Sequence, residues 1–205
     1  DRLATLNLKT KKISYFTSAI PWEVSGYTLS KDKSKIAFET NESGLNKLYL
    51  MDTNSKKYSE IKGLPVGLVN NFDFTDDGKS LFFSQSTYDS SADIYRLDLA
   101  TNKIERWTDS EQGEMQKADM SQPKLIEWKS FDDMKITGFY YPVSKKFTGK
   151  RPVLINIHGG PEGQSMASSL GSGNYYTNEM GVALIYPNVR GSSGFGKTYI
   201  ASDNG

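Results

Sequence analysis

The alternation of apolar and polar positions in the first half of the chain predicts short strands that recur at a fixed spacing. Residues 27–38 contain an apolar run, an Asp-containing turn and a second apolar run, and the same order returns in 72–83. Each unit continues into an alternating segment, at 48–50 and at 94–97, and then into a turn rich in Thr, Asn and Lys. Strands of this length between such turns indicate antiparallel hairpins.

Three turn segments make the repeat explicit. Residues 6–13, 50–57 and 97–104 align with one another, and each is followed by an aromatic residue. The offset of about 45 residues is typical of a propeller blade with four short strands. The sequence therefore predicts about two and a half blades of a β-propeller, with an ordinary antiparallel meander as the alternative. Because a propeller needs at least about four blades, we expect the others upstream of this chain.

The pattern changes in the second half of the chain. After Trp107 it becomes polar and irregular up to Met120, which predicts a linker. Two strand-like stretches, 124–129 and 135–142, then flank a turn at 130–134. They predict the antiparallel hairpin at the start of a mixed sheet.

Two further apolar runs, 153–157 and 182–186, predict additional strands of that sheet. The first run is short and stands between Pro152 and a pair of glycines, as is typical of a buried central strand. A short helix is expected around 175–180, and Gly181 would end it. Because a helix then separates two strands, these strands should be parallel neighbours joined by a crossover.

These patterns divide the chain into residues 1–118, the C-terminal blades of a β-propeller, and residues 119–205, the N-terminal part of an α/β-hydrolase domain. In the hydrolase fold the nucleophile stands on a later elbow of the form G-x-S-x-G. No serine of the sequence has glycine both two places before and two places after it. We therefore expect a fragment that is truncated before its nucleophile and inactive by itself.

Composition narrows the choice of chemistry and partners. The chain has 205 residues, of which 37% are hydrophobic and 24% are charged, and this composition favours a soluble globular protein. Its net charge of +1 and the lack of a long apolar run give no indication of binding to nucleic acid or to a membrane. It has no cysteine and one histidine, so disulfides and thiolate or His-cluster metal sites are excluded. We expect no metal and no cofactor. Oligomeric state and compartment, cytoplasmic or exported, stay open.

Three segments resemble markers of the prolyl oligopeptidase family of serine peptidases. Residues 158–164, with His-Gly-Gly-Pro, resemble the oxyanion loop of its acylaminoacyl-peptidase-like branch, and residues 188–197 resemble the next marker. Residues 130–138 resemble the domain-entry segment, where Asp-Gly is more usual than Asp133-Met134. The resemblance covers essentially the whole chain. It implies a propeller ahead of a hydrolase domain, and a Ser-His-Asp triad that hydrolyses short peptides through an acyl-enzyme.

The resemblance also implies roles for four residues. The backbone N–H of Gly160 is the first choice for an oxyanion donor and that of Gly159 the second, with a plain Gly-Gly turn as the alternative. His158 is expected to brace the loop, and a general base is the alternative. Arg190 is expected to brace the neighbouring loops, and binding of substrate or of a carboxylate is the alternative.

Two other functions are compatible with the same domains. One is a non-peptidase hydrolase of esters or amides, and the other is a propeller interaction module whose hydrolase segment is vestigial. The glycine-rich loop around Ser192 and Ser193 is interpreted as a turn, because neither serine has a base beside it in sequence. Its glycine spacing is not that of a phosphate-binding loop.

Overall fold

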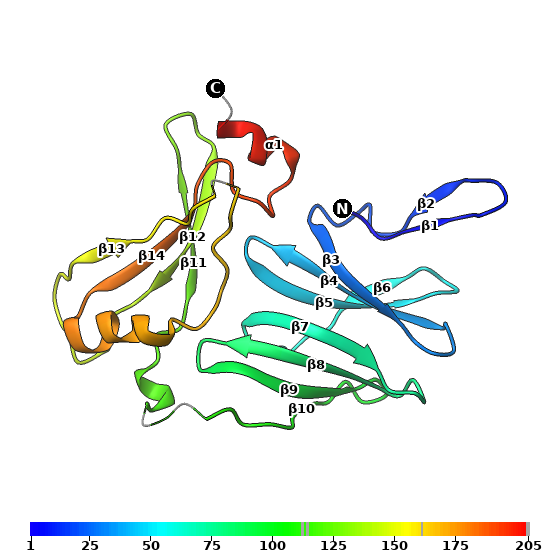
Figure 1. Cartoon of the computed structure of the whole chain (residues 1–205), viewed down its shortest axis with the longest axis horizontal. Helices are drawn as coiled ribbons and strands as arrows, with labels where there is room; N and C mark the ends of the chain where they lie inside the picture. The colour runs from blue at the N-terminus through cyan, green and yellow to red at the C-terminus, as the bar shows by residue number, and fades with distance from the viewer. Residues whose placement is uncertain (112, 114, 161, 204–205) are drawn as a thin grey trace.

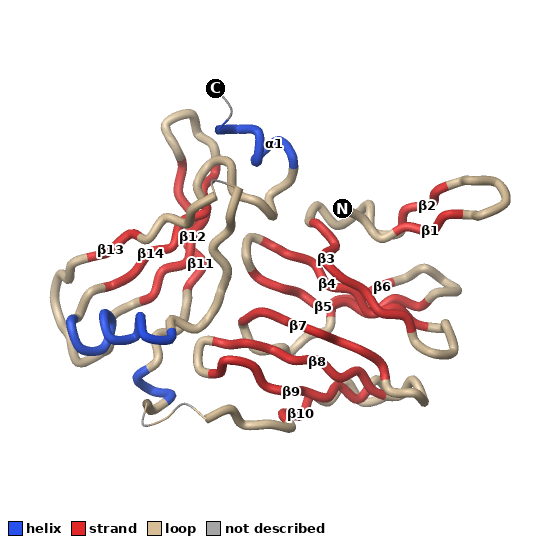
Figure 2. Tube along the Cα trace, in the orientation of Figure 1, coloured by secondary structure: helices blue, strands red, loops and turns tan. Residues whose placement is uncertain are grey.

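The computed structural model describes residues 1–111, 113, 115–160 and 162–203 of the chain. This part of the chain folds mainly into β-sheets, and its helices are short (Figures 1 and 2). None of these helices has the length and apolar character needed to cross a membrane. The strands form a small N-terminal hairpin, two similar antiparallel sheets and a mixed sheet.

The two similar sheets follow one another along the chain and have the same strand order. The first contains β3 (Glu23–Leu29), β4 (Lys35–Glu42), β5 (Leu45–Asp52) and β6 (Tyr58–Glu60). The second contains β7 (Gly67–Phe74), β8 (Ser80–Thr87), β9 (Ser90–Asp98) and β10 (Ile104–Arg106). The N-terminal hairpin joins β1 (Ala4–Leu6) to β2 (Ile13–Tyr15). The predicted series of antiparallel hairpins is therefore present.

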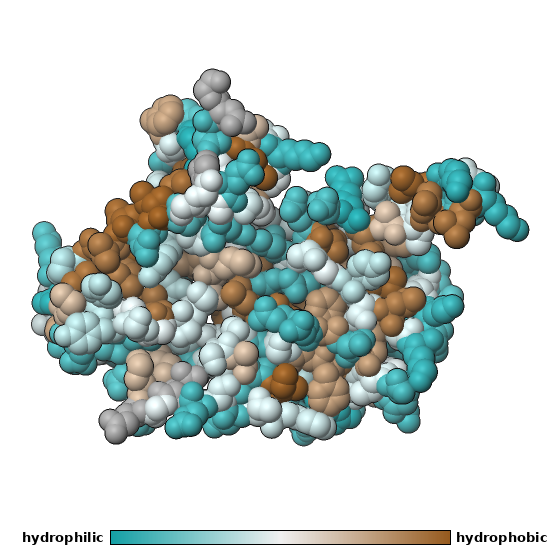
Figure 3. Space-filling model, in the orientation of Figure 1, coloured by the Kyte–Doolittle hydropathy of each residue, from teal (hydrophilic) through white to brown (hydrophobic). Residues whose placement is uncertain are grey.

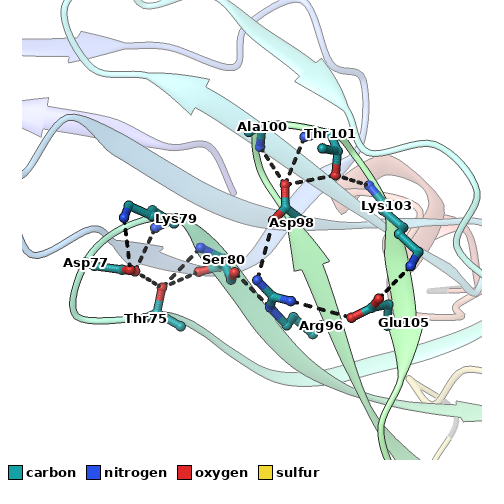
Figure 4. A network of polar contacts seen from close by, with 10 residues as sticks. All are labelled: Thr75, Asp77, Lys79, Ser80, Arg96, Asp98, Ala100, Thr101, Lys103 and Glu105. Carbon is teal, nitrogen blue, oxygen red and sulfur yellow. Dashed lines mark hydrogen bonds and ion pairs between the residues drawn. The ribbon is translucent and has the colours of Figure 1, made fainter.

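The aligned turns share one geometry, which explains the repeat in the sequence. In each, a side-chain oxygen accepts the backbone N–H groups two and three residues later, at 2.7 to 3.1 Å; the accepting residues are Asn7, Asp52 and Asp98. Figure 4 shows the turn at Asp98. Four residues beyond each acceptor, the backbone is left-handed, with φ of 57°, 60° and 56° at Lys11, Lys56 and Asn102. Asx turns of this kind favour the short polar residues found there.

Apolar side chains from the two similar sheets form one core between them. Ala37 and Leu48 of the first sheet meet Val69, Leu81 and Phe83 of the second, and all five are buried. The opposite face of the first sheet packs on the segment near the N-terminus. Figure 1 shows the two sheets side by side. The first sheet therefore packs against other parts of the molecule with both of its faces.

The mixed sheet contains, from edge to edge, β11 (Lys124–Lys129), β12 (Lys135–Tyr141), β14 (Ala183–Asn188) and β13 (Val153–Ile155). The hairpin β11–β12 is antiparallel and the pair β13–β14 is parallel, as predicted. The short helices of the described part are η1 (Lys117–Asp119), η2 (Gly171–Gly173), η3 (Tyr176–Met180), α1 (Lys197–Ile200) and η4 (Ala201–Asp203). Gly181 ends η3 in the left-handed conformation, with φ of 61°.

The prediction that residues 153–157 form a buried central strand is wrong for this structure. The strand β13 is shorter and lies at the edge of the sheet, and β14 is its one partner among the described strands. Its side chains Val153, Leu154 and Ile155 are 50%, 44% and 58% exposed. Figure 3 shows the resulting apolar patch over β13. The run has the composition of a covered strand, but no described element packs on it.

Candidate active site

The two glycine-rich loops that follow β13 and β14 meet at one edge of the mixed sheet. The carboxyl ends of parallel strands lie at the same edge, so the loops start side by side. The N–H of Asn156 extends the pairing by donating to the carbonyl oxygen of Ile185 at 2.8 Å. Further along, the N–H of Ser193 donates to the carbonyl oxygen of Gly163 at 3.0 Å. The parallel pair therefore brings together the two segments singled out by the sequence.

The backbone at Gly160 has a conformation that requires glycine. Its φ is 131°, and a Cβ there would lie 2.8 Å from the nitrogen of Gly163. Gly159 has open space around its Cβ position. Among the described residues, no hydrogen bond uses the N–H of Gly159 or Gly160, and both residues are exposed. Two N–H groups without an acceptor among the described residues thus stand next to each other in the loop. Pro161, which belongs to the sequence motif, lies outside the described residues.

His158 is held by a hydrogen bond to the second loop. The Ser192 hydroxyl donates to the carbonyl oxygen of Val189 at 2.6 Å, and its oxygen lies 2.8 Å from Nε2 of His158. Because the hydroxyl proton is used, the serine oxygen accepts and Nε2 carries a proton; this assignment follows from the hydrogen-bond network. The His158 side chain therefore ties the loop after β13 to the loop after β14.

The contact between Ser192 and His158 has the length of a Ser–His catalytic pair but not its surroundings. Ser192 is fully buried, and its proton points to a carbonyl oxygen. In a catalytic triad the second imidazole nitrogen donates to a carboxylate. Here Nδ1 of His158 lies 3.1 Å from the carbonyl oxygen of Gly159. These contacts support the bracing role predicted for His158.

Arg190 is engaged with the turn between β11 and β12. Its guanidinium forms an ion pair with Asp132, and this hydrogen bond lowers the pKa of the Asp132 carboxyl. The guanidinium carbon also lies 4.8 Å from the centre of the Phe131 ring, a cation–π geometry. The side chain thus joins the second loop to the entry hairpin of the mixed sheet, which supports a bracing role over substrate binding.

The sequence analysis did not identify Asn188 as part of the site. Its side chain is fully buried, and its Oδ1 accepts the N–H of Ser165 at 2.7 Å while its Nδ2 donates to the Ser165 carbonyl at 3.1 Å. This pairing holds the end of the first loop against β14. The sequence did contain a signal for this role, because the polar residue Asn188 directly follows the apolar run 182–187.

A pocket of about 370 Å³ opens beside His158. Its wall combines aromatic, apolar and polar side chains; the lining residues include Tyr141, Asn156, Gln164, Met166, Leu170 and Tyr186. This mixture is typical of pockets that bind small molecules. In the part of the chain that the structure describes, no group of three or more His, Cys, Asp or Glu side chains could hold a metal ion.

The chain is similar in sequence and in fold to known peptidases. No family model matches the chain. At 25% identity over 161 residues, the chain is similar to the uncharacterized peptidase YuxL of Bacillus subtilis (strain 168), and the match covers 72% of this chain and 23% of that protein. The chain thus spans less than a quarter of this curated relative.

Solved structures of peptidases share the fold. A puromycin-hydrolyzing peptidase of Mycobacterium tuberculosis superposes with a TM-score of 0.80 at 18% identity, over 97% of this chain and 31% of that one. An acylaminoacyl peptidase of Pyrococcus horikoshii gives a TM-score of 0.71 at 24% identity, over 92% and 28%. The relatives are thus peptidases of the prolyl oligopeptidase and acylaminoacyl peptidase family. The resemblance predicted from the motifs is confirmed.

Proposed function

We propose that the chain is part of a serine peptidase of the prolyl oligopeptidase family. Residues 1–118 would be blades of a β-propeller, and residues 119–205 would begin its α/β-hydrolase domain. The two sheets with equal strand order and equal turns support the first part. The parallel pair β13–β14 with its glycine-rich loop supports the second. The exposed apolar face of β13 fits a strand that further sheet and helices cover in the whole protein.

The observation that carries the proposal is the pair of N–H groups at Gly159 and Gly160 that no described residue accepts, in a loop fixed by His158 and Gly163. Acyl transfer places negative charge on the carbonyl oxygen of the substrate. A donor fixed toward that oxygen contributes about 2.7–4 kcal/mol to the transition state. Gly160 is the first choice for this donor, because its backbone conformation excludes a side chain where the substrate carbonyl would approach. Gly159 is the second.

The nucleophile and its partners would come from residues outside this chain. His158 does not fit the role of general base, because its Nε2–H group donates a hydrogen bond to the oxygen of the buried Ser192. The catalytic serine would attack the peptide carbonyl to form an acyl-enzyme, which water then hydrolyses. We propose short peptides as substrates. Similar structures include a puromycin hydrolase complexed with PGG and an acylaminoacyl peptidase complexed with Z-Gly-Gly-Phe-chloromethyl ketone.

The test compares variants of the full-length polypeptide that carries this chain. The polypeptide should hydrolyse aminoacyl or acyl-aminoacyl anilides and react with a fluorophosphonate probe. Gly160→Val would misdirect the donor, since a branched side chain collides with the backbone of Gly163. Its kcat should fall about 100-fold or more, with a much smaller change in KM.

Gly159→Ala is the matched control, because its Cβ meets open space and its N–H is retained. It should reduce kcat much less than Gly160→Val, as should His158→Ala. Circular dichroism must show that each variant is folded. A folded Gly160→Val enzyme with normal turnover, together with a His158→Ala enzyme that is inactive and has a shifted pH profile, would reverse the two roles. A full-length polypeptide that neither turns over nor reacts would favour the vestigial module.

A further inference from the structure

The hairpin between β4 and β5 reaches the candidate oxyanion loop from the other half of the molecule. Asn41, at the end of β4, donates from Nδ2 to Oε1 of Gln164 at 2.6 Å. In return, Nε2 of Gln164 lies 3.4 Å from Oδ1 of Asn41. The two amides thus form a reciprocal pair across 123 residues of sequence. Gln164 is the last residue of the His-Gly-Gly motif segment and lines the pocket beside His158.

Asn41 is itself fixed by the turn of its own hairpin. Its Oδ1 accepts the N–H of Gly44 at 2.9 Å. The carbonyl oxygen of Gly44 accepts the N–H of Ala167 at 3.0 Å, so the tip of the hairpin is bonded to the chain just after the loop. A Cβ on Gly44 would lie 2.6 Å from the Ser165 carbonyl and 2.8 Å from the Phe139 ring. The hairpin is therefore seated tightly against the mixed sheet.

The second glycine-rich loop closes over the same amide pair. A Cβ on Gly194 would lie 2.6 Å from both amide atoms of Gln164 and 2.8 Å from Nδ2 of Asn41. The next residue, Phe195, makes an edge contact with Trp22, with ring centres 6.1 Å apart. Two segments far apart in sequence thus pack against Gln164 of the first loop: the hairpin after β4 and the second loop.

We infer that Asn41 is a positioning residue for the oxyanion donor and acts through Gln164. This inference rests on the proposed function. Gln164 follows Gly163, whose nitrogen would be 2.8 Å from a Cβ on Gly160 and whose carbonyl oxygen accepts from Ser193. A shift at Gln164 therefore moves the backbone against which Gly160 is packed. The first sheet would thus help to set the direction of the donor through Asn41.

The effect should be on kcat, because the oxyanion forms only in the transition state. Asn41→Ala removes both hydrogen bonds of the amide pair and the bond from Gly44. Gln164→Met keeps the side-chain length but cannot form either bond of the pair. Small misplacements at an active site reduce rates strongly. We expect each variant to lower kcat about tenfold and to leave KM within about twofold.

The experiment is a double-mutant cycle in the full-length polypeptide, assayed with an aminoacyl anilide. If Asn41 acts through Gln164, the double variant should be no slower than the slower single variant. Hydrogen exchange of segment 162–167, followed by mass spectrometry, should be faster in Asn41→Ala. Thr28→Ala is the control, because it breaks the 2.8 Å bond to Asp73 between the two similar sheets without touching the loop.

The outcomes separate this inference from the proposed function. A wild-type polypeptide without turnover overturns the proposed function and the inference with it. Two results with an active wild type would overturn the inference alone. In one, the effects of the two single variants on kcat multiply in the double variant. In the other, kcat is unchanged in both single variants. If Asn41→Ala does not fold, the test rests on Gln164→Met. An unchanged kcat together with unchanged hydrogen exchange of segment 162–167 in that variant would contradict the coupling.

Discussion

At the scale of the residue, buried polar side chains hold irregular backbone in place. Asn188 binds both backbone groups of Ser165, and Ser192 links His158 to the carbonyl of Val189. Buried polar groups stabilise a structure only when they are hydrogen-bonded, so each of these residues specifies one position of its loop. The geometry of the candidate site therefore depends on residues that do not react.

Asp93 has a comparable role in the second sheet. Its carboxylate is fully buried and receives hydrogen bonds from Ser90, Arg106, Thr108 and Ser110. Burial alone would raise its pKa, but the bonds from Ser90, Thr108 and Arg106 outweigh burial and hold the pKa well below the ordinary value. The ionised carboxylate fastens the chain after β10 to β9.

We predict that Asp93→Asn destabilises the full-length polypeptide by about 3 kcal/mol at pH 7, because a buried set of charge-assisted hydrogen bonds is broken. Arg106 loses its buried partner and keeps its ion pair with the exposed Asp109. A group with a lowered folded-state pKa stabilises the fold above its unfolded pKa, about 4, and this contribution is lost as the pH falls further. Between pH 5 and pH 3 the wild type should therefore lose more stability than the variant. Urea unfolding at several pH values measures both effects.

Asp76→Asn is the control for this prediction. Asp76 is 91% exposed, and among the described residues its ion pair is with Lys31, so its replacement should change stability by less than about 0.5 kcal/mol. If Asp93→Asn were as mild as Asp76→Asn, the carboxylate would not be structural. A wild type and an Asp93→Asn variant with parallel pH profiles would contradict the lowered pKa.

At the scale of the element, local features were predictable from sequence and strand position was not. In the turns at Asp52 and Asp98 the carboxylate accepts backbone N–H groups two or three residues later, so a local pattern in the sequence is enough to predict them. The hairpin β11–β12 and the parallel pair β13–β14 follow from the order of apolar runs. The edge position of β13 depends on which other strands are present, and its composition does not show that.

In the candidate site, too, local features were predictable from the sequence and long-range contacts were not. Gly160 was identified because its motif is local, and its positive φ agrees with a glycine requirement. The amide pair of Asn41 and Gln164 joins residues 123 positions apart, in elements that no local pattern relates. Such a contact is visible only once the two halves of the molecule are packed together.

The exposed strand β13 leads to a prediction for the 205-residue chain alone. Val153, Leu154, Ile155 and Ile157 form an exposed apolar edge, and the β1–β2 hairpin exposes further apolar side chains (Figure 3). Patches of this kind mark surfaces that need a covering partner. Expressed alone, the chain should aggregate or bind the dye ANS strongly, and it should show no peptidase activity. A monodisperse sample with a cooperative melt would indicate instead a small complete domain.

At the scale of the whole molecule, the two halves meet at the loops of the candidate site. Asn41 of the first sheet contacts the first loop, and Trp22, which precedes β3, contacts the second loop. Figure 1 shows the β4–β5 hairpin pointing toward the mixed sheet. This arrangement supports a site built at the junction of a β-sheet unit and a hydrolase unit, as proposed for a peptidase of the prolyl oligopeptidase family.

The most direct test of this account is a crystal structure of the full-length polypeptide with a peptide boronate, which mimics the tetrahedral intermediate. The account predicts that one boronate oxygen lies about 2.7–3.1 Å from the backbone nitrogen of Gly160, with the boron bound to a serine outside this chain. His158 should keep its bond to Ser192. A boronate oxygen that binds elsewhere, with Gly160 turned away, would contradict the central claim, as would boron bound to Ser192 itself.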